Sequence, residues 1–359
     1  MVKESSINVF RCKNCLNMST RPRITFDERG WCNACQWMEE KKSFNWVKRE
    51  KELERLLAKY RSKRGEFDCA VPVSGGKDGS YIAYTLKTKY GMNPLCINVT
   101  PPLPEEIGEE NLKNFAASGF NLIQLHLNSE IMRFIDKRGF IDKGFPYFGW
   151  LIAIRSAVIR TAAQFDLSLI FYGEDGELEY GGSTETKNTT LQTIDYQKKI
   201  YFEEGYDEIL NQMPEELKRE SVFWRFPDEN ILKEKEIYTT AWSYFENWDP
   251  YRNYLIAKEH CGLLEKEDTN LGTFTNFSQN DQRLYALHTY LMYLKFGFGR
   301  AVQDAGIEIR RGAMSRDQGL NLIKMYDGSY PEDNIETYLN YYQMSNEEFD
   351  AVIDHHVNK

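Results

Sequence analysis

A short apolar run that breaks into a glycine turn constrains this chain more than any other feature. Residues 68–73 read DCAVPV, which is typical of a buried parallel strand. Ser74, Gly75 and Gly76 follow, and residues 81–86 have the composition of a helix. Glycines let backbone N–H groups converge, and the N-terminus of a helix carries partial positive charge. The stretch therefore predicts a strand, turn and helix that bind phosphate, although an ordinary strand-to-helix turn would read similarly.

The spacing of this turn excludes two common phosphate loops. A Walker A loop needs four residues between its first glycine and Gly-Lys-Ser/Thr, and the Gly-x-Gly-x-x-Gly pattern is absent as well. The turn instead resembles the PP-loop, Ser-Gly-Gly-x-Asp-Ser, of ATP pyrophosphatases. Gly79 stands where that family usually has its first serine, and Ser80 follows, so either Ser74 or Ser80 could serve the phosphate. The resemblance implies bound ATP, with Asp78 holding Mg²⁺. The implied ATP-binding residues are Ser74, Gly75, Gly76, Lys77, Asp78, Gly79 and Ser80.

Four of the seven cysteines form two Cys-x-x-Cys pairs near the N-terminus. They are Cys12 with Cys15 and Cys32 with Cys35, and sixteen residues separate the pairs. This spacing matches a structural tetrahedral Zn²⁺ site with four thiolate ligands. An iron–sulfur cluster or disulfides are the alternatives. Metal binding would fold a segment that is too short to fold alone.

From residue 68 onward the chain alternates between strand and helix patterns. Further buried strands are expected at 95–99, 121–127, 167–172 and 237–242, with helices at 105–118 and 150–164 between them. The pattern predicts an α/β fold with a doubly wound, Rossmann-like parallel sheet of the PP-loop (HUP-like) type, which binds ligands beyond the carboxyl ends of its strands. Glu174 follows the fourth strand in an acidic turn and could hold Mg²⁺ or a sugar hydroxyl. A solvated acidic turn is the alternative.

Four regions are expected along the chain: a Cys₄ zinc ribbon at 1–43, a linking helix at 44–66, the α/β domain at 67–260 with a possible mobile insertion at 183–230, and a helical region at 261–359. Helices are expected at 281–301 and 308–325. In the segment between Lys295 and Arg300, two cations flank two glycines and could neutralise a leaving pyrophosphate. The alternative is a helix C-terminus stopped by glycine. The terminal His355 and His356 read as a frayed tail.

Composition limits the possible partners and compartments. The formal net charge is −9, which argues against a nucleic-acid partner. No run approaches the roughly 18 apolar residues of a membrane span, and the N-terminus lacks a signal-peptide pattern. A cytoplasmic protein without a membrane partner is therefore expected.

Taken together, these features resemble the N-acetyl sugar amidotransferases of bacterial surface-polysaccharide biosynthesis. The resemblance spans nearly the whole chain, and the order of the ribbon, the glycine turn and the Lys295–Arg300 element is its most specific part. It implies that an N-acetyl group on a free or nucleotide-activated sugar becomes an acetamidino group, for lipopolysaccharide O-antigen, capsule or flagellar glycan. ATP would adenylylate the amide oxygen, and ammonia would displace AMP. The implied catalytic residues are Asp78, Lys295, Arg300 and Glu174.

The source of ammonia is expected to lie outside this chain. The sequence shows no glutaminase nucleophile, so the resemblance implies a separate glutaminase subunit like that of imidazole glycerol phosphate synthase, in some cases with its barrel-shaped companion. The main alternative is a tRNA-thiolation enzyme, which would need a reactive cysteine or an iron–sulfur cluster near the loop. Cys69 and Cys96 flank the predicted crevice. A zinc-ribbon interaction module that only binds nucleotide is a third possibility.

Overall fold

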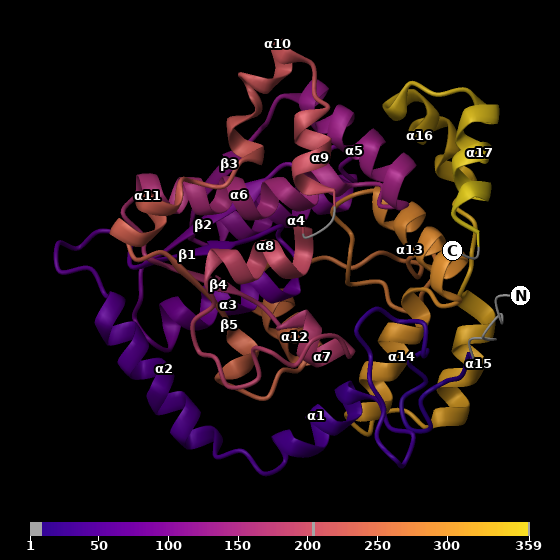
Figure 1. Cartoon of the computed structure of the whole chain (residues 1–359). Coiled ribbons are helices and arrows are strands. Elements are labelled where there is room, and N and C mark those ends of the chain that lie inside the picture. The colour runs from indigo at the N-terminus through magenta and orange to yellow at the C-terminus, as the bar shows by residue number, and fades with distance from the viewer. Residues whose placement is uncertain (1–8, 203–204, 358–359) are drawn as a thin grey trace, which may run out of the picture.

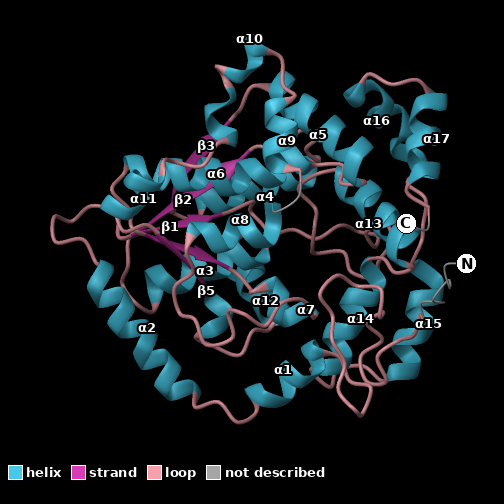
Figure 2. Cartoon of the chain, in the orientation of Figure 1, coloured by secondary structure: helices cyan, strands magenta, loops and turns pink. Residues whose placement is uncertain are grey.

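Five parallel strands form the centre of the part of the chain that the computed structural model describes, residues 9–202 and 205–357 (Figures 1 and 2). The strands are β1 (Cys69–Pro72), β2 (Pro94–Val99), β3 (Asn121–Leu125), β4 (Leu169–Tyr172) and β5 (Tyr238–Ala241). Their spatial order is β3-β2-β1-β4-β5, and every neighbouring pair is parallel. Starting from β1, the chain adds β2 and β3 on one side and then β4 and β5 on the other side. This order confirms the predicted doubly wound α/β fold.

The burial of each strand depends on its place in the sheet, because helices cover both faces of the sheet. All six residues of β2 are buried, whereas β3 at one edge exposes Asn121 and Gln124 and has no fully buried residue. Central strands that contact helices on both faces need apolar side chains at every position, while an edge strand does not. The topological switch point falls between β1 and β4, where ligands bind in open α/β sheets. The glycine turn follows β1 and therefore lies at this point.

Helices cover the two faces as separate layers. One face packs with α2 (Trp46–Tyr60), α3 (Lys77–Thr88), α4 (Glu106–Ala117) and α12 (Pro250–Cys261). The other face packs with α5 (Ser129–Lys143) and α6 (Phe148–Gln164), and α6 contacts both β1 and β2. The region after β4 contains α7 (Gly176–Tyr180), α8 (Ile194–Phe202), α9 (Tyr206–Asn211), α10 (Glu215–Lys218), a 3₁₀ turn at Ser221–Trp224 and α11 (Glu229–Glu234). The buried Trp224, whose indole N–H donates to Gly149 O at 3.0 Å, anchors the region to α6.

The C-terminal region is helical, as expected, but its helices are shorter than predicted. They are α13 (Leu284–Phe296), α14 (Arg300–Arg310), α15 (Arg316–Tyr326), α16 (Ile335–Tyr342) and α17 (Asn346–His355), with a 3₁₀ turn at Glu332–Asn334. The expected helix 281–301 breaks at Gly297, whose φ of 73° places it in the left-handed region as a C-cap. The expected helix 308–325 breaks at Gly312, with φ of 81°. His356 corrects the frayed-tail interpretation, since it is buried with Nε2 at 3.1 Å from Phe140 O.

The N-terminal ribbon packs against the C-terminal helices, although more than 250 residues separate them in sequence (Figure 1). Leu16 and Met18 share a buried apolar cluster with Val302, Ala305 and Ile323 from α14 and α15. The ribbon continues into α1 (Asn33–Lys41) and then α2, whose Leu53 and Leu57 enter the core beside the sheet. Across the described residues, no helix combines the length and the apolar character that crossing a membrane requires.

Candidate active site

The glycine turn joins β1 to α3 and is closely packed on both sides. Gly75 has φ of 79°, and a side chain there would place Cβ 2.5 Å from the backbone nitrogen of Leu112 in α4. Gly79 is not strained, but its Cβ would lie 2.7 Å from the carbonyl oxygen of Pro72. This contact is the physical reason for a glycine where PP-loops usually have serine. Only a residue without a side chain fits at either position.

The two serines of the turn occupy different environments. Ser74 lines the cavity above the turn, whereas Ser80 is fully buried in α3 and its hydroxyl has no hydrogen-bond partner among the described residues. Of the two hydroxyls considered from sequence, the structure therefore brings Ser74 to the crevice and turns Ser80 away from it.

A cavity of about 270 Å³ opens beyond the carboxyl ends of β1 and β4. It combines residues from the turn, from the segment after β4 and from the C-terminal region. Its lining comprises Pro72, Ser74, Gly76, Lys77, Asp78, Gly79, Gly108, Asn111, Glu174, Tyr180, Leu263, Phe277, Ser278, Gln279, Asn280, Asp281, Tyr285 and Arg300. A parallel sheet places ligands in this position. The fold thus brings predicted residues from three distant parts of the chain to one cavity.

Three acidic side chains, Asp78, Glu174 and Asp281, and two cations, Lys77 and Arg300, give this cavity its charge. Asp78 pairs with Lys77 and accepts a hydrogen bond from Asn253 Nδ2 at 3.0 Å. Glu174 accepts from the Tyr180 hydroxyl at 2.6 Å, and burial together with the nearby Asp78 raises the pKa of Glu174. Carboxylate oxygens are the ligands that Mg²⁺ prefers, so this pair fits a magnesium-bound triphosphate.

Arg300 supplies the second cation of the cavity. It is the first residue of α14, and its Nε donates to Asp304 Oδ1 at 2.9 Å, one helical turn away. That ion pair holds the guanidinium at the cavity wall. A planar guanidinium in this position suits a phosphate ligand.

Lys295 does not join Arg300 in the cavity lining, contrary to the prediction that both face the crevice. Its ammonium donates to Lys143 O at 2.6 Å, at the end of α5. The left-handed turn at Gly297 ends α13 and redirects the chain before α14 begins. Because of that turn, Lys295 and Arg300 lie in different surroundings although they are only five residues apart in sequence.

This difference predicts unequal effects of two alanine substitutions. Arg300→Ala should lower turnover by a factor on the order of 10², because a preorganised cation is lost from the phosphate site. Lys295→Ala should leave turnover close to wild type and lower the melting temperature, since it removes a hydrogen bond of a charged donor worth about 1.5–3 kcal/mol. Steady-state AMP formation and thermal unfolding of both variants test this.

Arg300→Lys is the matched control for that pair. It keeps the positive charge and should retain more turnover than Arg300→Ala. Equal turnover losses in Lys295→Ala and Arg300→Ala, without a change in stability, would contradict the assignment.

The acidic turn after β4 is buried, which corrects the alternative of a solvated turn. Asp175 caps the N-terminus of α7 and accepts from Thr186 and from Gln192, the latter at 3.1 Å. Glu177 pairs with Arg23 of the ribbon at 2.7 Å. Of the three acidic residues between 174 and 177, only Glu174 lines the cavity. The others hold the local structure.

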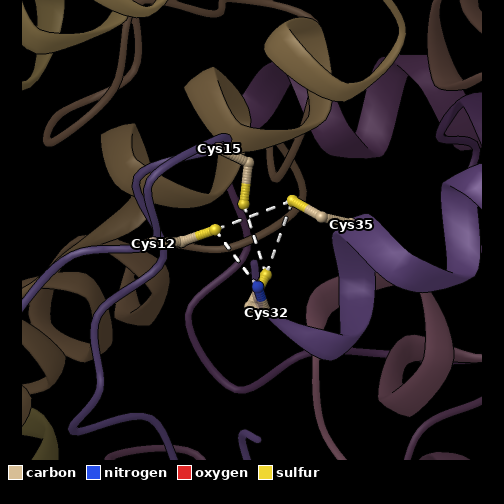
Figure 3. A group of neighbouring side chains, drawn as sticks. All are labelled: Cys12, Cys15, Cys32 and Cys35. Atoms are coloured by element: carbon tan, nitrogen blue, oxygen red, sulfur yellow. Dashed lines mark hydrogen bonds between the residues drawn. The ribbon is translucent and has the colours of Figure 1, made fainter. Parts of the chain in front are cut away.

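The four ribbon cysteines point toward a common centre (Figure 3). The Sγ–Sγ distances are 3.8 Å for Cys12 and Cys35, 3.4 Å for Cys15 and Cys32, and 3.7 Å for Cys32 and Cys35. A tetrahedral ion with metal–sulfur bonds of about 2.3 Å would hold its sulfurs about 3.8 Å apart. All four Sγ atoms lie within 4.8 Å of one another, so the four cysteines could hold a metal.

Polar groups around the cluster complete it as a metal site. The side-chain amide of Asn14 donates to Cys35 Sγ at 3.3 Å, and that of Asn17 to Cys32 Sγ at 3.5 Å. The backbone N–H of Cys32 donates to Cys12 Sγ at 3.2 Å. Such donors stabilise thiolates and orient them toward a metal.

The ribbon also holds α7, which carries Tyr180 of the cavity. Lys41 forms an ion pair with Glu179 at 2.8 Å, and both side chains are almost fully buried. Trp37 Nε1 donates to the same carboxylate at 2.9 Å, and Asn17 donates to Tyr180 O at 3.1 Å. Because Tyr180 in turn binds Glu174, the metal site supports one wall of the cavity through direct contacts.

Several residues of the cavity were not singled out from sequence. Tyr180 directly precedes two glycines, and Asn253, which donates to Asp78 without lining the cavity, lies in a helix with no distinguishing pattern. Asn280 and Asp281 lie in a polar run, residues 278–283, that precedes the apolar helix α13. That run reads as a helix start, and its only functional signal is its polarity.

The strand order and the glycine turn together define a PP-loop-type α/β protein with an N-terminal four-cysteine metal site. Residues 271–359 match the family described as "LPS biosynthesis protein WbpG-like, C-terminal domain". The match covers the C-terminal quarter of the chain and supports the family resemblance seen in its motifs.

Comparison with other proteins gives two further similarities. An uncharacterized protein of Methanocaldococcus jannaschii, MJ1599, is 31% identical over 105 residues, which is 29% of this chain and 38% of that relative. A solved structure, the U34-tRNA thiolase NcsA from Methanococcus maripaludis with its 4Fe–4S cluster, covers 77% of this chain and 80% of its own, with 14% identity and a TM-score of 0.32. At that score the geometry of one chain does not inform the other, and the fold assignment rests on strand order.

Proposed function

We propose that this protein is an ATP-dependent amidotransferase that converts the N-acetyl group of a sugar into an acetamidino group. One observation carries the proposal. The cavity that contains the glycine turn also contains Asn280, Asp281, Tyr285 and Arg300, all within the WbpG-like segment. The segment similar to a lipopolysaccharide-biosynthesis family thus contributes side chains to the cavity that we propose binds ATP. We therefore propose that the acceptor is a precursor sugar of a polysaccharide.

The chemistry requires activation of an amide. An amide carbonyl is a poor electrophile, and its oxygen is a poor leaving group. Attack of this oxygen on the α-phosphorus of ATP releases pyrophosphate and leaves AMP on the oxygen. Ammonia then adds to the carbon, and AMP departs. The protein must position these groups, neutralise charge and exclude water from the activated imidate.

The residues of the cavity divide these tasks. Ser74 and the backbone N–H groups of the turn bind phosphate oxygens. Arg300 neutralises the departing pyrophosphate, and Lys77 offsets the charge of Asp78 beside it. Mg²⁺, when bound by Asp78 and Glu174, would offset the charge of the triphosphate. The ribbon metal is proposed to be Zn²⁺ in a structural role, because all four ligands come from the protein.

The remaining cysteines do not support the tRNA-thiolation alternative. Cys69, Cys96 and Cys261 are buried in the apolar cluster between the sheet and α3, and none of them lines the cavity. Burial raises the pKa of Cys96 to about 12 and that of Cys261 to about 11. A sulfur-transfer or glutaminase nucleophile needs an accessible thiolate. We therefore assign the supply of ammonia to a separate glutaminase subunit that docks on this chain.

The direct test is the mass of the product. A panel of UDP-activated N-acetyl amino sugars and their uronic acids would be incubated with the protein, ATP, Mg²⁺ and ammonium at raised pH. Conversion should lower the mass of one sugar by the difference between O and NH, with one AMP and one pyrophosphate released per product. Release of ADP and phosphate instead, or product formation without ATP, would refute the proposed reaction.

Glutamine provides the matched control for the ammonia source. Glutamine alone should not replace ammonium for the isolated chain, and adding the glutaminase subunit should restore product formation. If the isolated chain uses glutamine as well as ammonium, the ammonia source lies within it and the proposed partner is wrong.

A further inference from the structure

Asp281 lies where three cavities meet. The first is the glycine-turn cavity described above. The second, of about 360 Å³, lies at the carboxyl ends of β2 and β3 and includes Asn98, Thr100 and Gln124. The third, of about 190 Å³, lies beneath the turn against α6 and includes Trp150. Among the described residues, only Ser74 and Asp281 line all three cavities.

The backbone around Asp281 is held firmly in this position. Asp281 O accepts from Glu105 N at 3.2 Å, and the N–H of the nearby Arg283 donates to Leu103 O at 2.9 Å. Gly108 in the first turn of α4 approaches so closely that a Cβ there would lie 2.5 Å from Asp281 Cα. Gly75 of the glycine turn packs against the same helix one turn later. Helix α4 therefore fixes both the phosphate turn and Asp281 relative to each other.

The surroundings keep the Asp281 carboxyl without a cationic partner. The Tyr285 hydroxyl lies at 3.5 Å from Oδ2, the carboxyl acts electrostatically on Tyr147, and Glu105 is paired with Lys266. Across residues 9–202 and 205–357, no lysine or arginine forms an ion pair with Asp281. Burial, and then Glu105, raises the pKa of Asp281 to about 6. This carboxyl differs from Asp78 and Glu174, which already have partners in the triphosphate site.

We propose that Asp281 is the general base that accepts a proton from the attacking ammonia. This role rests on the proposed amidotransferase function. The reaction must bring nucleotide, acetamido carbon and amine to one point, and three cavities meet at Asp281 opposite the phosphate turn. The ammonia lone pair forms the new C–N bond, the C–O bond to AMP breaks with its electron pair remaining on AMP, and one proton passes from the new nitrogen to the Asp281 carboxylate. The product leaves as the amidinium.

Separating the two half-reactions tests this role. Adenylylation is followed by exchange of labelled pyrophosphate into ATP in the presence of the sugar and the absence of ammonia, with UDP-N-acetylglucosaminuronic acid as the first probe. Amidation is followed by product mass with ammonium present. Asp281→Asn should retain exchange within a fewfold of wild type and lose amidation by a factor on the order of 10² or more. Glu106→Gln is the matched control, because Glu106 is an exposed carboxylate in the first turn of α4 that lines none of the three cavities. It should retain both reactions.

A pH profile of the wild type supplies a readout that needs no variant. With free ammonia held constant, amidation should fall as pH drops below about 6, because the base becomes protonated, while exchange should not follow that profile. Asp281→Glu should restore part of the amidation with a displaced profile.

The possible failures are distinguishable. If wild type makes no acetamidino sugar from the panel, the proposed function fails and this role with it. If wild type makes the product but Asp281→Asn loses exchange and amidation in parallel, or keeps both, only the role of Asp281 is overturned.

Discussion

Asparagine in place of Asp78 should lower the rate of ATP cleavage to AMP and pyrophosphate by a factor on the order of 10² or more. Asp78 lies in the first turn of α3 beside the glycine turn, and its carboxylate faces Glu174 across the cavity. Asparagine keeps the size of the side chain and the hydrogen bond from Asn253, but it removes the charge that would hold Mg²⁺. Chromatographic measurement of AMP under saturating ATP and sugar gives the result.

A second aspartate provides a control for this substitution. Asp317 also lies in the first turn of a helix, α15, but it is exposed and outside the cavity. The Asp317→Asn variant should therefore cleave ATP at the wild-type rate. If Asp78→Asn cleaves ATP as fast as Asp317→Asn does, Asp78 is not a ligand of the reacting nucleotide.

The serines of the turn extend the same test. Ser74→Ala should lower turnover by a similar factor, because Ser74 lines the cavity. Ser80→Ala should leave turnover nearly unchanged, because the Ser80 hydroxyl is buried away from the cavity without a partner. The reverse order of effects would show that the phosphate lies on the α3 side of the turn.

Loss of the ribbon metal should unfold the N-terminal region and abolish activity. Zinc contributes an apparent binding free energy of about 10–16 kcal/mol in small zinc-bound peptides, so a ribbon of this kind folds only with its ion. Cys32→Ser should lose the metal, lower the melting temperature and stop turnover, because α7 and Tyr180 would lose their contacts with the ribbon. Elemental analysis of anaerobically purified wild type should give about one zinc per chain.

Metal exchange separates this structural role from a redox role. Removing the ion with a chelator and then adding zinc should restore both the melting temperature and turnover. Stoichiometric iron with visible iron–sulfur absorption in the wild type would overturn the zinc assignment and favour sulfur chemistry.

Much of the fold follows from local patterns in the sequence. Each of the five strands occurs within two or three residues of its predicted range, because an apolar run between turn residues is a local signal. The four cysteines converge as their spacing indicated, because two Cys-x-x-Cys turns joined by a short loop have few other arrangements. The lengths of the C-terminal helices were less predictable. Glycine is compatible with a helix interior, so the sequence left open whether a glycine ends the helix between Lys295 and Arg300, and the observed φ values identify Gly297 and Gly312 as helix stops.

By itself, therefore, the sequence determined the class of sheet, the glycine turn after its first strand and the convergence of the four cysteines, since each depends on residues close together in the chain. Only the tertiary structure decided which side chains share the cavity. It separated Lys295 from Arg300, brought Asp281 opposite Ser74 across more than 200 residues, and buried Lys41 against Glu179 to join the ribbon to the site. The physical reason is that these placements depend on the direction of the chain after a left-handed glycine and on close contacts between helices. Neither leaves a periodic pattern in the sequence.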